Sequence, residues 1–299
     1  MDRAQFSKKP LKYEEQIELL KQRGIVIENE QKAIHILQTI SYYRLSGYWF
    51  PFLEDKKTHI FKPNSTFESA FKLYCFDRKL RQLVISELEK IEVSIRAKMA
   101  YIMSNAYDPF WYINNDLFTN QKLHETSLNK IYEEYKRSDE EFIKAFKTKY
   151  SDNLPPSWII FEITSFGALS LIFKNLKPSN EKREIAHYYG ISDTVFQTWL
   201  HSIVYLRNIC AHHTRLWNRS MSITPQIPRK TKYPWIDTQG ISNNKVYFNL
   251  SMIMYLIQTI NPHNSFTNKL KELLSEFKNI DIKAMGFPVN WTEEPLWKK

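Results

Sequence analysis

Glycine is scarce in this chain, with 6 among 299 residues, and no glycine-rich phosphate-binding pattern occurs. Neither GxGxxG nor GxxxxGKS/T is present, which argues against a dinucleotide-binding enzyme and against a P-loop NTPase. Cysteine is rarer still, because the chain has only Cys75 and Cys210, far apart in the sequence. These two residues imply no disulfide framework, so we expect a protein of a reducing compartment.

Long apolar runs are missing too. Residues 1–16 contain no apolar stretch of the kind that signal peptides carry. No apolar run reaches membrane-spanning length, since the longest are interrupted by Glu162 or by serine and glutamine. These absences predict a soluble, cytoplasmic protein.

Positive charge is in excess, because 42 Lys and Arg against 32 Asp and Glu give a formal net charge of +10. The excess is spread along the chain rather than held in a tail. Nucleic acid is the commonest acidic partner of such a protein, although net charge bears on association and not on fold. Aromatic residues make up 15% of the chain, and those that do not belong to the core can stack on bases.

Apolar residues recur at three- and four-residue steps along most of the chain, while β signals are few and short, so we predict an all-α fold. The aromatic-rich segment 42–52 is expected to pack the N-terminal helices against the body of the protein. The segments that we expect to be helical are 12–24, 28–41, 67–104, 121–150, 156–176, 179–190, 192–213, 245–260 and 264–279.

Glu162 lies in the nearly all-apolar segment 156–176, where we expect it to be buried. A buried carboxylate is costly without a donor or a cation beside it. An internal ion pair between helices is the reading that we favour, and support behind a catalytic cation is the alternative. On the segment 67–104, Glu92 and Arg96 are spaced to pair on one helix face, which we interpret as structural.

The segment 192–213 carries two stripes at helical spacing. One is apolar: Val195, Trp199, Ile203, Leu206 and Cys210. The other is polar: Gln197, His201, Tyr205, Asn208 and His212. The polar stripe has no lysine or glutamate, which a solvated helix face usually carries. We therefore expect this face to meet another surface or to line a cleft.

The stretch RNICAHH, residues 207–213, ends this helix. Asn208 and His212 are one turn apart and can touch the same ligand. Arg207 and His212 are about 140° apart around the axis, a gap that a long arginine side chain can reduce. Spacing alone leaves two readings open. The cations can belong to a catalytic site, or they can simply stabilise the helix C-terminus by roughly 0.3–1 kcal/mol each.

RNICAH is an Rx4H motif with asparagine after the arginine, the form typical of HEPN-domain ribonucleases. Further blocks surround it in order: YYRLSGYWFPF, LYCFDRKLR, EKIEVSIRAKMA, PPSWIIFEITSFGALS and LRNICAHHTRLWNR. Together they resemble the abortive-infection proteins of the AbiD/AbiF-like family, which are bacterial phage-defence proteins. The resemblance covers about residues 10 to 260, and the C-terminal tail lies outside it.

The resemblance implies a HEPN-type helical bundle. Its core would span about residues 65–260, preceded by an N-terminal helical extension, 1–64, within a single domain of residues 1–299. It also implies a metal-independent RNA endonuclease whose site forms where two protomers bring their motifs together. Similar members are thought to act with a small noncoding RNA, and they resemble the ribonuclease halves of RNA-guided CRISPR effectors.

The resemblance assigns catalysis to Arg207, Asn208 and His212. The neighbouring His213, Arg215 and Arg219 are candidates for RNA contact, although a solvated loop explains them equally well. Glu162 lies in a matching block without an assigned role, and our alternative reading places it behind the catalytic cation. We expect neither a cofactor nor a metal. A zinc site of Cys210, His212 and His213 would lack a fourth ligand at recognisable spacing.

These residue types suit RNA cleavage. RNA carries its own nucleophile, the 2′-OH, and needs a base, an acid and positive charge at the phosphate. Histidine can serve as base or acid near neutral pH, and arginine presents a fork of donors to phosphate oxygens. A two-fold dimer would supply two motif histidines. Two other functions stay open: a non-catalytic RNA-binding protein, and a HEPN toxin controlled by a partner protein or by nucleotide modification.

Overall fold

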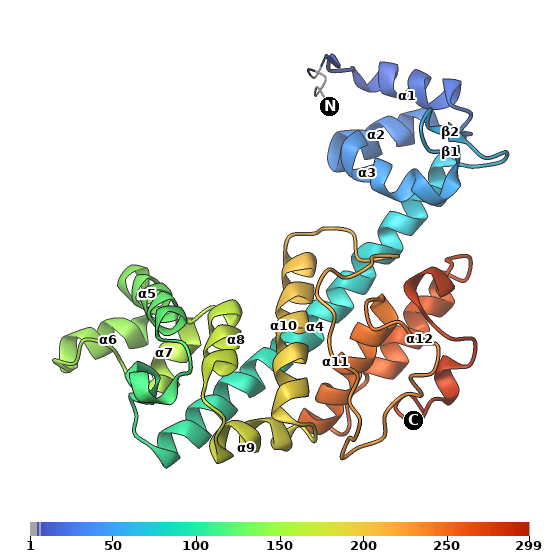
Figure 1. The fold of residues 1–299 in the computed structure, drawn as a ribbon. Helices are drawn as coiled ribbons and strands as arrows, with labels where there is room; N and C mark the ends of the chain where they lie inside the picture. The colour runs from blue at the N-terminus through green and yellow to red at the C-terminus, as the bar shows by residue number, and fades with distance from the viewer. Residues whose placement is uncertain (1–4, 6, 299) are drawn as a thin grey trace. The chain divides into compact units, whose positions relative to one another are not determined.

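The computed structural model describes residue 5 and residues 7–298, and the chain divides into two compact units. The N-terminal unit comprises residues up to Lys79 together with Leu273–Ile280, and the large unit comprises Leu80–Glu272 and the segment from Asp281 onward. Figure 1 shows the order of the elements along the chain. We predict that the two units fold as one domain, and this stays a prediction.

The N-terminal unit is a small helical cluster with a short hairpin. Its elements are α1 (Tyr13–Gln22), α2 (Glu30–Ile40), α3 (Tyr42–Trp49), η1 (Phe50–Phe52), β1 (Leu53–Asp55), β2 (Ile60–Phe61) and the beginning of α4 (Phe67–Ala106). Asn29 caps α2 by accepting a hydrogen bond from the Lys32 backbone N–H at 2.9 Å. The helices expected at 12–24 and 28–41 are confirmed as α1 and α2.

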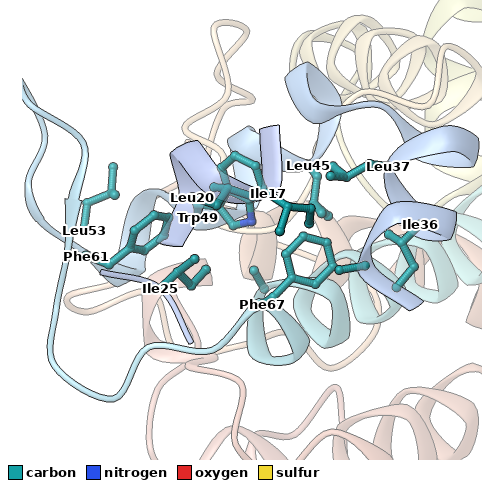
Figure 2. Packing of buried hydrophobic residues seen from close by; sticks show 12 residues of the cluster. Ile17, Leu20, Ile25, Ile36, Leu37, Leu45, Trp49, Leu53, Phe61 and Phe67 are labelled. Carbon is teal, nitrogen blue, oxygen red and sulfur yellow. The ribbon is translucent and has the colours of Figure 1, made fainter. Parts of the chain in front are cut away.

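One apolar cluster holds this unit together, as Figure 2 shows. Side chains from all three short helices meet in it: Ile17, Leu20, Ile36, Leu37, Leu45 and Trp49. Trp49 packs edge-on against Tyr42, with ring centroids 4.8 Å apart. The inner face of the aromatic-rich segment 42–52 therefore belongs to the core of its own unit.

The N-terminal unit also takes in a segment from near the other end of the sequence. Phe277 lies edge-on against Phe76, with ring centroids 5.6 Å apart. Lys79 forms an ion pair with Glu276 and lies over the Phe277 ring. The unit is thus built from two pieces of chain that are almost 200 residues apart, since the Lys79–Glu276 pair has a sequence separation of 197.

The large unit is a bundle of α-helices with irregular connections. After α4 come η2 (Trp111–Ile113), η3 (Asn115–Leu117), α5 (Gln121–Arg137), α6 (Glu141–Lys149), α7 (Ser157–Ile163), α8 (Phe166–Asn175), α9 (Asn180–Tyr188), α10 (Asp193–Ala211), α11 (Val246–Ile260), α12 (Phe266–Glu276), η4 (Lys283–Met285) and η5 (Trp291–Glu293). Helix α10 packs against α8, α9 and α11, so it is surrounded on most of its apolar side.

The all-α prediction is confirmed, because the two short strands β1 and β2 are the whole sheet content of the described residues. The HEPN type of the bundle stays a prediction. Within the described part of the chain, no helix combines the length and the apolar character needed to cross a membrane.

The segment 156–176 was expected to be one helix, but it forms two. Thr164 and Ser165 adopt extended backbone angles and separate α7 from α8. Partners from elsewhere satisfy the backbone groups at this break: Arg96 donates to the Thr164 carbonyl at 2.5 Å, and Glu134 accepts from the Ser165 N–H at 3.0 Å. Apolar periodicity cannot show such partners, which is why the break was missed. The segment expected at 121–150 is likewise two helices, α5 and α6.

The break also corrects the expected burial of Glu162. This residue lies near the end of the short helix α7, and its side chain is exposed rather than buried. The preceding residues Ile160 and Phe161 enter the core. A carboxylate that faces solvent needs no internal partner, so the favoured reading of Glu162 as half of a buried ion pair is wrong.

Asn175 joins the end of α8 to the start of α5, and its removal should destabilise the large unit. Its side chain, 4% exposed, donates to the Asn120 carbonyl at 2.8 Å and accepts from the Asn120 N–H at 2.9 Å. We expect Asn175→Ala to lower the free energy of unfolding in urea by about 1–3 kcal/mol, because both backbone groups lose their partner. Asn105→Ala, at an exposed helical position, should change it by less than about 0.5 kcal/mol. Equal effects of the two substitutions would contradict the argument.

Candidate functional site

Helix α10 carries the RNICAHH motif and is fixed by its apolar side. Ser192 begins the helix, and its side chain accepts from the Val195 N–H at 3.4 Å. The predicted apolar stripe is confirmed as buried, with relative exposures of 8% or less for Val195, Trp199, Ile203, Leu206 and Cys210. The indole nitrogen of Trp199 donates to the Gln226 carbonyl at 2.8 Å, which ties the following loop to the helix. The motif therefore sits on a rigid element.

The predicted polar stripe of α10 lies on the opposite side of the helix. His201, Asn208 and His212 are exposed, and Gln197 and Tyr205 are half-buried. The face is thus a surface of neutral hydrogen-bonding groups rather than the wall of an internal cleft. Such a face loses less solvation free energy on meeting another macromolecule than a face of lysines and glutamates would.

The C-terminus of α10 fixes the two adjacent histidines by its backbone. His212 is the capping residue, and the next two N–H groups turn back: His213 donates to Cys210 at 3.1 Å, and Thr214 donates to Ile209 at 3.1 Å. His213 has a φ of 56°, the left-handed conformation that glycine usually occupies at this place in a helix end. Both histidines are exposed.

Arg207 is held on two sides, but loosely. Its Nε lies 3.8 Å from Oε2 of Glu92 on α4, and its Nη1 donates to Oδ1 of Asn208 at 3.5 Å. The Arg207 side chain is 43% exposed, and an ion pair of that exposure and length contributes only about 0–1 kcal/mol. The contacts orient the guanidinium group and leave it free to exchange partners.

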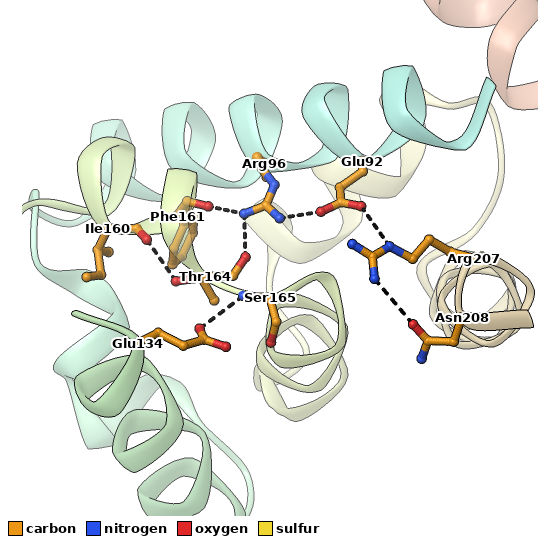
Figure 3. Close-up of polar contacts among 9 residues, drawn as sticks. All are labelled: Glu92, Arg96, Glu134, Ile160, Phe161, Thr164, Ser165, Arg207 and Asn208. Carbon is orange, nitrogen blue, oxygen red and sulfur yellow. Dashed lines mark hydrogen bonds and ion pairs between the residues drawn. The ribbon is translucent and has the colours of Figure 1, made fainter. Parts of the chain in front are cut away.

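Glu92 is itself held by Arg96, as Figure 3 shows. The ion pair predicted between these two residues on α4 is confirmed, and both side chains are largely buried. Arg96 also donates to the carbonyls of Phe161 and Thr164 at the end of α7. A chain of arginine, glutamate and arginine thus links α10 to α4 and to the break between α7 and α8. Sequence spacing showed the Glu92–Arg96 pair, but gave no signal that Glu92 also faces Arg207.

A pocket of about 620 Å³ opens beside Arg207. Three carboxylates, those of Glu89, Glu92 and Glu162, line it together with Arg96 and Arg207. The structure therefore brings Glu162 to the same pocket as Arg207, although no ion pair joins the two among the described residues. The supporting role of Glu162 stays a prediction.

His212 lies outside the lining of that pocket. Ala211 is the last residue of α10 that contributes to it, and the exposed His212 follows at the helix end. Within one chain, the structure thus brings Arg207 together with Asn208 and Glu92, while the motif histidine faces the surface. Sharing of the site between two chains would reconcile this arrangement with a catalytic role.

Arg219, in the loop after the motif, lies near the polar face of α10. Arg219 donates to the Arg215 carbonyl at 2.9 Å. The hydrogen bond between Tyr205 and Ser222, at 3.4 Å, lowers the pKa of Tyr205, and the nearby Arg219 adds to this effect. The predicted RNA contact Arg219 therefore lies beside the polar stripe. The RNA-contact roles of Arg215 and His213 stay predictions.

The Cys210 thiol is 3% exposed, whereas its neighbours His212 and His213 face solvent. Across the residues that the structure describes, no three His, Cys, Asp or Glu side chains are grouped as metal ligands would be.

The left-handed conformation of His213 gives a stability test of the helix end. We expect His213→Gly to raise the free energy of unfolding by up to about 1 kcal/mol, since glycine adopts this conformation without strain. His212→Gly is the matched control, because His212 has a φ of −85° and gains nothing from glycine. Urea denaturation measures both. A loss of stability as large for His213→Gly as for His212→Gly would contradict this account of the helix end.

Comparison with known families gives one match. A family model described as Abi-like protein matches residues 35–218, which include α10 and the whole RNICAHH motif. No curated protein and no solved structure is detectably similar to the chain. The matched region exceeds half of the sequence, and it contains Glu92, Arg96, Glu162 and Arg207. The chain belongs to the Abi-like protein family.

Proposed function

We propose that this protein is a phage-defence endoribonuclease that cleaves RNA by attack of the 2′-OH and needs no metal ion. The observation that carries the proposal is the exposed neutral face of α10, on which Asn208 accepts a hydrogen bond from the guanidinium of Arg207 and His212 follows one helical turn later. Membership of the Abi-like family supports it, because abortive infection is the defence role that the resemblance implies. We also propose that a small noncoding RNA accompanies the protein.

In this mechanism, His212 moves protons and Arg207 binds the phosphate. The exposed imidazole of His212 can take the 2′-OH proton or give a proton to the departing 5′-oxygen. The guanidinium of Arg207 neutralises the charge that develops on the phosphorane oxygens. Asn208 contacts Arg207 and is one helical turn from His212, so its amide can position either group.

Glu92 has a positioning role in this proposal. Its pairing with Arg207 is long and half-exposed, so a phosphate can replace the carboxylate at small cost. The carboxylates of Glu89 and Glu162 repel a phosphate inside the pocket beside Arg207. The scissile phosphate therefore approaches Arg207 from the neutral face of α10, where Asn208 and His212 lie.

A homodimer would complete the site. One chain offers one motif histidine, and general acid–base cleavage needs both an acid and a base. A second copy that packs on the neutral face of α10 would bring a second His212 to the same phosphate. The exposure of that face makes it available for such a contact.

Removal of the motif side chains tests the assignment. We expect Arg207→Ala and His212→Ala each to reduce cleavage of a mixed single-stranded RNA pool by at least about 100-fold, since each removes charge or proton transfer from the reaction. His263→Ala, which removes an exposed histidine of the loop between α11 and α12, is the control and should retain activity. Cleavage by wild type should persist in EDTA. Full activity of the Arg207→Ala/His212→Ala protein would remove this site, and RNA binding without cleavage by wild type would favour a non-catalytic RNA-binding protein.

Mixed dimers test whether both chains contribute a histidine to one active site. Intact and His212→Ala chains with different affinity tags are co-expressed and purified over both tags. If acid and base come from different chains, the mixed dimer should be about as inactive as a dimer of two His212→Ala chains. The one remaining His212 can serve as acid or as base, and the other role is then unfilled. A mixed dimer with half or all of the wild-type rate, or a monomeric wild-type protein in light scattering, contradicts a shared site.

A further inference from the structure

A second pocket, of about 570 Å³, lies entirely within the N-terminal unit. Its walls come from the segment before α1, from α1, from α3 with η1, and from the hairpin β1–β2. None of its lining residues is an aspartate or a glutamate. The pocket beside Arg207 has three carboxylates, so the two pockets differ in the charge that they accept.

The cations of this pocket are not neutralised by nearby acids. Lys8, Lys9 and Arg23 line it, and no described carboxylate forms an ion pair with any of them. Arg23 donates from Nη1 to the Tyr42 hydroxyl at 2.7 Å, and this bond fixes the guanidinium group of Arg23 in the wall of the pocket. Lys56 lies over the Phe50 ring, 4.6 Å from its centroid. The pocket therefore attracts an anion.

Two aromatic side chains of the pocket are exposed to an unusual degree. Tyr43 is 90% exposed and Phe50 is 50% exposed, whereas Trp49 between them in sequence is only 4% exposed. We expected the whole segment 42–52 to pack, and this holds for its inner face only. Packing does not account for Tyr43, which has a free ring for a flat partner.

Two buried polar atoms of the lining residues have no partner. The indole Nε1 of Trp49 is a donor without an acceptor, and Oε1 of Gln16 is an acceptor without a donor, among the described residues. The amide nitrogen of Gln16 already donates to the Leu11 carbonyl at 2.9 Å, which fixes the orientation of the amide. Buried polar groups in proteins are normally paired, but both of these atoms are fully covered, so they are not groups that an occupant of the pocket contacts directly.

We propose that this pocket binds an unpaired nucleotide of RNA, whose base stacks on Tyr43 while Lys8, Lys9 and Arg23 hold its phosphates. A nucleobase is flat, so it suits the exposed ring of Tyr43, and its phosphates suit the unpaired cations of the same pocket. Base stacking on aromatic side chains in a basic groove is the usual way to bind single strands. An RNA duplex hides its bases in the stack, so the pocket selects single-stranded RNA over duplex.

This inference deepens the proposed function, because it names a feature of the RNA that the nuclease would recognise. It is nevertheless measured by binding and not by cleavage. The pocket belongs to the N-terminal unit, and its lining residues include none of the residues of the Arg207 site.

The test measures binding of a fluorescein-labelled single-stranded RNA of mixed sequence by anisotropy. The full-length chain carries His212→Ala in every sample so that the RNA stays intact. We expect Tyr43→Ala to weaken binding about tenfold through lost stacking, and Lys8→Ser/Lys9→Ser to weaken it and to reduce its salt dependence. Tyr43→Phe should bind like the parent, because stacking uses the ring. Tyr132→Ala, which removes a 49%-exposed tyrosine of α5, is the matched control and should have no effect.

Further binding measurements distinguish a nucleotide within RNA from a free mononucleotide. If the pocket takes RNA, labelled duplex should bind more weakly than single strand, and 4-thiouridine RNA should crosslink to the peptide that contains Tyr43. If Tyr43→Ala instead abolishes binding of AMP or GMP and leaves RNA binding intact, the occupant is a free nucleotide. Unchanged binding of RNA and of both mononucleotides in Tyr43→Ala and in Lys8→Ser/Lys9→Ser overturns the proposal. Absence of cleavage together with RNA binding at the pocket would contradict only the proposed nuclease activity. Cleavage together with no RNA binding at the pocket would contradict only the proposed binding site.

Discussion

The carboxylate of Glu92 lies between two guanidinium groups, and the orientation of the Arg207 side chain depends on it. On one side Arg96 forms an ion pair with it and also donates hydrogen bonds to the carbonyls of Phe161 and Thr164. On the other side Arg207 approaches it at 3.8 Å. A largely buried ion pair thus orients a half-exposed cation. The buried pair fixes the position of the Glu92 carboxylate, and the Arg207 side chain stays accessible to solvent.

Much of the helical architecture follows from sequence periodicity. The apolar stripe of α10 is buried as predicted, and the Glu92–Arg96 pair forms at its predicted spacing. The break at Thr164 and Ser165 could not be predicted, because its backbone groups are satisfied by Arg96 and Glu134, which are distant in sequence. The same break explains why Glu162 is exposed and not buried. Local patterns specify elements well, whereas long-range hydrogen bonds decide where an element stops.

The placement of the predicted site residues on one helix end followed from their spacing, whereas their surroundings followed only in part, and the catalytic assignment stays a prediction. Arg207, Asn208 and His212 occupy one helix end, as their spacing requires, and the neutral stripe lies at the surface. The pairing of Glu92 with Arg207 joins residues 115 positions apart (207 − 92), and no local pattern reports it. The unpartnered atoms of Gln16 and Trp49 are equally invisible in the sequence, because both residue types usually find partners when buried.

The N-terminal unit includes Phe277 and Glu276, which pack on Phe76 and pair with Lys79. A ribosome makes a chain from its N-terminus, so these two partners emerge almost 200 residues after the rest of the unit. The N-terminal unit therefore cannot be completed until Glu276 and Phe277 have been synthesised. A chain whose translation stops early would carry the RNICAHH motif without a completed N-terminal unit.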